Sequence, residues 1–221
     1  GRHDRQYQNF QVCKPSAPGL HQISLFPVTN VQCMAFDCLA IEGAKVRFFD
    51  GRKEKRAQWE KNGRIWTPVF VEDHFVCDDA VQLKQRSAIL PCTNADVLIC
   101  ELELSRIPEA WSMEVSGKFF RPCRFSLDSE NVLWGVVCRE VPDFRFTDGP
   151  WKGTEAPSTA VGTPFAVFCD QEFLEGTPAG ESSQYVIRYK VQEKKIRILF
   201  AAGLEQKDVA KALKFVQDNL E

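Results

Sequence analysis

Residues 157–169, Pro-Ser-Thr-Ala-Val-Gly-Thr-Pro-Phe-Ala-Val-Phe-Cys, hold the pattern on which the fold assignment turns. A turn at Gly162, Thr163 and Pro164 runs directly into an apolar run over 165–169. Glycine lacks a Cβ and tolerates close backbone approach or unusual φ, whereas proline fixes φ and does not sit within a central ladder. Such a turn can direct successive backbone N–H groups at one point. The stretch therefore predicts a strand that is entered through a tight turn.

The rest of the chain repeats this texture of short apolar segments separated by Gly, Pro, Asn and Asp. We expect strands at 23–26, 45–49, 64–71, 75–81, 96–104, 119–125, 132–141, 165–169, 185–191 and 196–201. Many short strands at similar spacing favour an all-β sandwich or barrel over βαβ units. Only 205–220 has helical periodicity, with Val209, Leu213, Phe215 and Val216 mostly on one stripe.

Composition narrows the classes of function. The net charge is −2, so no global basic field argues for nucleic-acid binding. The nine cysteines form no CxxC pair, and only His74 lies near a cysteine (Cys77) at ligand-like spacing, so we expect no metal and no cofactor. Cysteines inside apolar runs behave as small buried hydrophobes, and free thiols point to a reducing compartment. No apolar run approaches twenty residues, so we expect no membrane span.

Three positions are candidates for catalytic chemistry. His74 follows an apolar run, and a neutral imidazole is the natural group to take a proton near neutral pH. A structural or exposed histidine is the alternative. Asp96 opens an alternating apolar strand and could orient such a histidine, or could simply cap the strand; Glu101 and Glu103 are fallback acids. Position 161 precedes the Gly-Thr-Pro turn.

The order His74, Asp96, 161 and the turn resemble the chymotrypsin-fold proteases, particularly the 3C-like cysteine proteases of picorna-like viruses. Their nucleophile turn reads Gly-x-(Ser/Cys)-Gly-x-Pro. Gly162, Thr163 and Pro164 match this motif, but the nucleophile position holds Val161 and the first Gly is Thr159. The resemblance implies a cysteine endopeptidase that processes a viral polyprotein in the host cytoplasm.

By that resemblance, His74 is the general base, Asp96 the orienting acid and 161 the place of the thiol. Backbone N–H groups of Thr159, Ala160 and Val161 form the oxyanion hole. Valine has no nucleophilic atom, so the chain as written is expected to be inactive, either through a substitution or as a natural pseudoprotease.

The substrate pocket follows from the same comparison. Phe200 stands where the family has a histidine that reads Gln, and Thr154 and Ser158 lie on the other pocket wall. A phenylalanine cannot donate a hydrogen bond, so the resemblance implies a relaxed or shifted preference before the cut.

The resemblance also implies a single domain over 1–221 with two antiparallel six-stranded β-barrels. Its parts are an N-terminal arm (1–22), barrel one (23–106), a linker (107–117), barrel two (118–203) and a C-terminal helix (204–221).

A binding module is the alternative from another class, in which a dead protease fold holds an extended peptide by strand addition. The resemblance also implies a viral RNA partner, and basic residues that alternate with aromatic ones in the middle of the chain could form the patch for it. These residues are Lys118, Arg121, Arg124, Arg139 and Arg145 with Phe119, Phe120, Phe125 and Phe144. Exposed Arg alternating with buried Phe on strands explains the same pattern.

Overall fold

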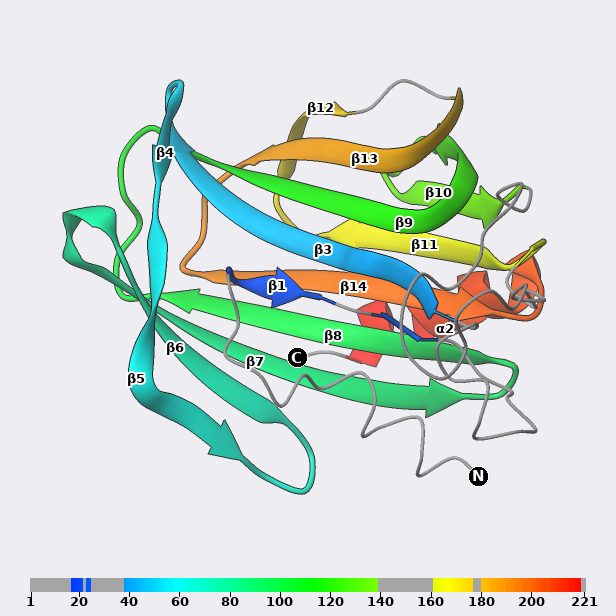
Figure 1. Cartoon of the computed structure of the whole chain (residues 1–221), viewed down its shortest axis with the longest axis horizontal. Coiled ribbons are helices and arrows are strands. Elements are labelled where there is room, and N and C mark those ends of the chain that lie inside the picture. The colour runs from blue at the N-terminus through cyan, green and yellow to red at the C-terminus, as the bar shows by residue number, and fades with distance from the viewer. Residues whose placement is uncertain (1–16, 22, 25–37, 139–160, 177–179, 220–221) are drawn as a thin grey trace, which may run out of the picture.

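Antiparallel strands build most of the chain, and one helix follows them (Figure 1). The computed structural model describes residues 17–21, 23–24, 38–138, 161–176 and 180–219. The expected all-β class with a C-terminal helix is confirmed. The elements are β1 (Gly19–Leu20), β2 (Ile23–Ser24), β3 (Cys38–Asp50), β4 (Lys53–Lys55), β5 (Ala57–Trp66), β6 (Val71–Cys77), β7 (Val81–Cys92), β8 (Ala95–Leu104), β9 (Trp111–Leu127), β10 (Leu133–Val137), β11 (Pro164–Cys169), β12 (Glu172–Gly176), β13 (Gly180–Lys190), β14 (Lys195–Gly203) and α2 (Gln206–Asn219).

The strands join into one curled sheet. Its order is β1-β3-β9-β10-β11-β14-β8-β7-β6-β5, with β13 also pairing β9, β12 pairing β13, and β2 and β4 pairing β3. The division into two six-stranded barrels is therefore not what the ladder shows. The expected linker 107–117 is also wrong from Trp111 onward, because this segment is the first half of β9. The polar residues around Pro108 mark only the turn before β9.

The curl brings β1 and β3 against β8 and β14 and encloses the main core. Phenylalanines dominate its centre: Phe165 stacks on Phe200 with ring centroids 5.6 Å apart and on Phe119 at 4.6 Å. Rings of this size, removed fully from water, each contribute roughly 2–3 kcal/mol of burial free energy. Phe200 is fully buried here, so the expected pocket residue is a core residue.

The outer face of the β8–β14 region divides into two halves, and the strand sequences show where. Inward positions of β14 are apolar throughout, whereas its outward positions change from Lys195 and Arg197 to Leu199 and Ala201. Helix α2 covers the apolar half with Val209, Ala212, Leu213 and Val216. These lie at i, i+3, i+4 and i+7, one face of a helix. Phe215, expected on this stripe, is exposed instead. The charged half has no helix over it among the described residues (Figure 1).

Gly19 fixes how β1 lies on β3. It has φ +114°, and a Cβ there would sit 2.1 Å from the Ala44 carbonyl oxygen. The buried Gln85 side chain of β7 reaches across the core to this point: its Oε1 accepts from Gly19 N at 2.7 Å and its Nε2 donates to Gly19 O at 3.1 Å. A buried amide satisfied in this way stabilises one register of the chain entry.

Four buried thiols line the main core: Cys77, Cys100, Cys123 and Cys169. Burial raises the pKa of Cys77, Cys100 and Cys123 to about 12, and it raises the pKa of Cys169 further. These groups pack as neutral hydrophobes and not as nucleophiles.

Candidate functional site

The expected catalytic pair, His74 and Asp96, lies at opposite ends of the sheet. His74 on β6 is level with Lys84 on β7, which is level with Glu103 on β8. Seven residues of β8 separate Glu103 from Asp96, which is about 23 Å at roughly 3.3 Å per residue. A general base and its orienting acid must lie within hydrogen-bond reach of each other. The structure therefore does not bring these two residues together.

Val161 lies toward the Asp96 end. It is 43% exposed and precedes β11, whose Phe165 pairs with Ala202, which in turn pairs with Asp96. The turn itself has the expected geometry, since Gly162 has φ +85° and donates to Val137 O at 2.8 Å. The other expected residues of the oxyanion hole and pocket, Thr154, Ser158, Thr159 and Ala160, lie outside the described residues.

The expected RNA-binding patch is divided by the fold. Phe119 and Phe125 are buried in the core and cannot stack on bases, and Arg121 is also buried. Lys118 and Arg124 are exposed. Arg139, Arg145, Phe144 and the side chain of Phe120 lie outside the described residues. For the described positions, the alternation of exposed and buried side chains on β9 accounts for the pattern.

His74 instead lines a hollow of about 340 Å³ on the uncovered, charged half of the sheet. Four strands contribute side chains: Glu60 from β5, His74 from β6, Gln82 and Lys84 from β7, and Glu103 from β8. A concave site with a few converging polar and titratable groups is the usual form of a ligand site. We therefore take this hollow as the candidate functional site.

A bulge in β5 forms one wall of the hollow. Trp59 pairs with Phe75 and Arg64 with Asp73, so four residues of β5 lie opposite His74 alone. The bulge packs closely over the imidazole, since a Cβ on Gly63 would lie 3.1 Å from His74 Cβ. Extra residues on one strand bend it and re-aim its side chains.

Asp73 holds both ends of this bulge from the core side of the sheet. Its Oδ1 accepts from Trp59 Nε1 at 3.1 Å and from Arg64 Nε at 2.7 Å, and its Oδ2 accepts from Arg64 Nη2 at 3.0 Å. Asp73 is buried and the Arg64 side chain is only 13% exposed. A two-pronged guanidinium–carboxylate pair is geometrically strict, so it fixes where the bulge begins and ends.

Glu72 determines which ring nitrogen of His74 faces it with a proton. Burial alone would raise the pKa of the Glu72 carboxyl, but hydrogen bonds from His74 and Arg86 outweigh it and hold that pKa below its ordinary value. Glu72 is therefore an ionised acceptor, with Oε1 2.7 Å from His74 Nε2 and Oε2 2.7 Å from Arg86 Nε. His74 Nε2 must carry the proton in this contact. In the neutral imidazole, Nδ1 then presents a lone pair to the hollow.

The hydrogen-bonding capacity left in the hollow is mostly that of acceptors. Glu60 Oε2 lies 4.0 Å from His74 Nδ1, beyond hydrogen-bond range, so no direct hydrogen bond joins these two atoms across the hollow. Lys84 is engaged with Glu103 at 2.5 Å, and this hydrogen bond lowers the pKa of Glu103. Besides His74, the charged groups of the lining are two carboxylates, Glu60 and Glu103, and one ammonium, Lys84.

Cations on the next strand do not change this balance inside the hollow. Lys195 and Arg197 on β14 are directed to Glu101, at 3.1 and 3.6 Å. Glu101 does not line the hollow.

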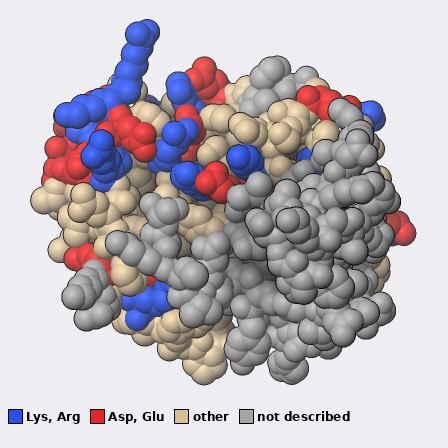
Figure 2. Space-filling model, in the orientation of Figure 1, with Lys and Arg blue, Asp and Glu red and all other residues tan. Residues whose placement is uncertain are grey.

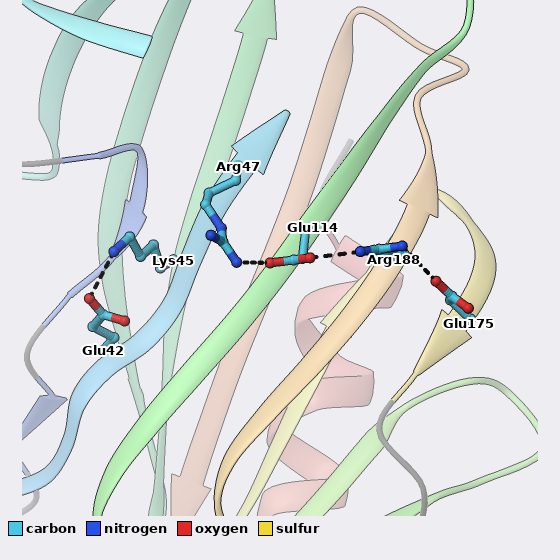
Figure 3. Close-up of polar contacts among 6 residues, drawn as sticks. All are labelled: Glu42, Lys45, Arg47, Glu114, Glu175 and Arg188. Atoms are coloured by element: carbon cyan, nitrogen blue, oxygen red, sulfur yellow. Dashed lines mark hydrogen bonds and ion pairs between the residues drawn. The ribbon is translucent and has the colours of Figure 1, made fainter. Parts of the chain in front are cut away.

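On the outer face of the other layer, a cluster of charged side chains pairs within itself. Buried Glu114 on β9 lies between Arg47 of β3 and Arg188 of β13, and Arg188 also binds Glu175 of β12 at 2.9 Å (Figure 3). Each guanidinium there has a carboxylate partner. Figure 2 shows Lys and Arg interspersed with Asp and Glu on the face that it presents. Mixed charge of this kind gives no extended basic field.

Sequence reasoning found His74 and kept Glu103 as a fallback acid, but it missed Glu60, Glu72 and Lys84. Glu60 lies in a charged run, 52–61, that carries no sequence signal for a bulge. The sequence of β8 does carry a signal for which part of the outer face the helix leaves uncovered. Its outward positions are Ala95, Val97, Ile99, Glu101 and Glu103. That change from apolar to acidic marks the uncovered half.

No group of three or more metal-ligating side chains occurs among the described residues. No helix in the part of the chain that the structure describes is long and apolar enough to cross a membrane.

Comparison with known proteins finds only distant structural similarity. No family model and no curated protein sequence matches the chain. Among solved structures, it is similar to the inverting mannosidase BT2199 of family GH92 from Bacteroides thetaiotaomicron, with 10% identity and a TM-score of 0.49 over 87% of this chain and 25% of that one. It is also similar to a candidate kojibiose phosphorylase from the human microbiome, with 8% identity and a TM-score of 0.26 over 88% of this chain and 28% of that one. The chain thus spans about a quarter of the length of these structures, and likeness at this level carries no argument about function.

Proposed function

We propose that the protein is a binding module that takes an ammonium or guanidinium group, such as a basic side chain of a peptide, in the hollow beside His74. One observation carries the proposal: Glu60 Oε2 faces His74 Nδ1 at 4.0 Å, and no described residue donates a hydrogen bond to the Glu60 carboxylate. A donor-rich cation placed between them satisfies both atoms. Glu103 offers a third acceptor on the opposite wall.

Shape and charge agree with a small cationic group. The hollow is open, and its lining mixes polar side chains with Phe75, Leu83 and Leu104, so it suits the tip of a side chain that carries both an aliphatic stem and a charge. The Glu60 and Glu103 carboxylates of the lining attract a cation, although solvent screens exposed charges strongly. We expect millimolar affinity for an isolated group, about −4 kcal/mol.

A matched pair of probes tests this. N-acetyl-arginine amide and its citrulline analogue have nearly the same shape and differ in charge. In a ¹⁵N–¹H NMR titration, the arginine probe should shift the amides of Glu60, His74 and Lys84, and the citrulline probe should not. Glu60→Gln should weaken arginine binding about fivefold, the loss expected for one partly exposed charged contact.

The control variant is Glu130→Gln, the same change in the exposed β9–β10 turn, and it should leave binding unaltered. Equal binding of arginine and citrulline, or shifts centred elsewhere, would overturn the proposal.

The endopeptidase expectation is not proposed as the function of this geometry. It rests on the order of His74, Asp96 and position 161 in the sequence, and the register leaves His74 far from the other two. Restoring a thiol at 161 tests it directly, as set out below.

A further inference from the structure

An apolar shelf adjoins the hollow on the same face. Ile65 lies directly opposite Glu72 in the β5–β6 ladder, so the two side chains share a face, and Ile65 is 50% exposed. Phe70 flanks Glu72 from the other direction, and the Arg86 guanidinium that binds Glu72 lies 5.3 Å from its ring centre. We call Ile65 and Phe70 the shelf.

A tight turn holds the shelf in place. Thr67 Oγ1 donates to Phe70 O at 2.8 Å and accepts from Phe70 N at 2.9 Å, and Thr67 N donates to Phe70 O at 3.0 Å. These bonds close the hairpin between β5 and β6 at the point where the shelf lies. A surface ordered before binding loses less conformational entropy when a partner docks.

The spacing between hollow and shelf matches an extended peptide. His74 marks the hollow and Glu72 marks the level of the shelf, two residues apart on β6. That separation is about 7 Å, which is also the distance between side chains i and i+2 of an extended chain.

We propose that the partner of this face is an extended peptide with a basic residue and, two positions away, a large apolar residue. The basic side chain enters the hollow between Glu60 and His74, and the apolar one lies on the shelf. Charge complementarity with the acidic lining selects the first residue, and the exposed shelf selects the second. This inference rests on the proposed function, since it assumes that the hollow takes a cation.

The test compares short peptides at fixed pH and salt by NMR titration. Ac-Arg-Ser-Leu-NH₂ and Ac-Leu-Ser-Arg-NH₂ cover both chain directions, and Ac-Arg-Ser-Ser-NH₂ and Ac-Ser-Ser-Arg-NH₂ are their matched controls. In one direction, leucine should improve affinity about fivefold over serine, the gain for partial burial of a leucine side chain. Ile65→Ser should bring the two affinities together.

Leu174→Ser, an equally exposed apolar residue on β12 in the other layer, is the control and should keep the leucine advantage. If the arginine peptides bind but leucine adds nothing in either direction, the shelf inference is wrong and the proposed function stands. If N-acetyl-arginine amide and all four peptides fail to bind, both are wrong.

Discussion

Neutralising Asp73 tests how the wall of the hollow is held. Asp73→Asn keeps the shape of the side chain and an acceptor for Trp59, but it removes the charge opposite Arg64. Breaking one partner of a buried ion pair costs about 3–5 kcal/mol. Since an asparagine oxygen still accepts one bond and Arg64 keeps 13% exposure, we expect a loss somewhat below that range, about 2–3 kcal/mol. For a chain of this size that is roughly a 5–10 °C drop in Tm.

Thermal and urea unfolding would measure the change. Asp218→Asn breaks an exposed ion pair with Lys214 on α2 and is the matched control, with an expected loss below about 0.5 kcal/mol. Adding Arg64→Met to Asp73→Asn should recover part of the loss, because the double variant no longer leaves a buried charge opposite a neutral group. NMR should also show broadened amides over 60–63 and weaker arginine binding. A Tm within about 1 °C of the parent would refute the conclusion that Asp73 holds the bulge through Trp59 and Arg64.

Three further predictions follow from the same contacts. Gly19→Ala should lower the free energy of unfolding in urea by about 3 kcal/mol or more, because the new Cβ meets the Ala44 carbonyl oxygen. Gly162→Ala is the control: Gly162 has φ +85° but open space around it, so the loss should be only about 1 kcal/mol. Similar losses for the two variants would contradict the Gly19–Ala44 contact. Val161→Cys should cleave no member of a peptide library, since His74 lies at the other end of the sheet; cleavage blocked by a thiol reagent would revive the endopeptidase hypothesis. Because the pKa of Glu72 is lowered in the folded state, its ionised carboxylate stabilises the fold at pH values above its unfolded pKa of about 4.3, and this stabilisation is lost as pH falls through the folded pKa. Glu72→Gln should therefore flatten the acid limb of a pH–stability curve. An unchanged acid limb would count against the His74–Glu72–Arg86 contacts.

The fold class was predictable because its signal is local. In β14, Lys195 and Arg197 alternate with apolar residues before the strand becomes apolar on both faces, and Gly and Pro mark turns elsewhere in the chain. The helix was predictable for the same reason, from four apolar residues at helical spacing.

Strand pairing was not predictable, because partners are distant in sequence. β14 lies between β11 and β8 and so joins the last strand to the first half of the chain, as in the pair Lys195–Glu103. The pattern of apolar and polar residues in β14 or β8 does not indicate that the two strands pair with each other. The expected two-barrel fold would place β8 and β14 in different barrels, whereas the β8–β14 ladder joins them in one sheet.

The candidate site was half predictable. His74 stood out as a titratable group after an apolar run, but its neighbours depend on register and on an irregularity. The bulge places Glu60 over His74, and only the structure shows that four residues of β5 lie opposite one residue of β6.

The four buried thiols of the described residues are also built-in probes of how the sheet unfolds. A reagent such as a maleimide reacts with the thiolate, and burial keeps these groups protonated and shielded until their strand separates. Cys77, Cys100, Cys123 and Cys169 lie on β6, β8, β9 and β11, so they sample four different strands of the ladder. Pulse labelling followed by peptide mass spectrometry would therefore time the release of each strand separately. The order of labelling would show whether the β5–β6 edge detaches before the centre or the whole sheet opens as one unit.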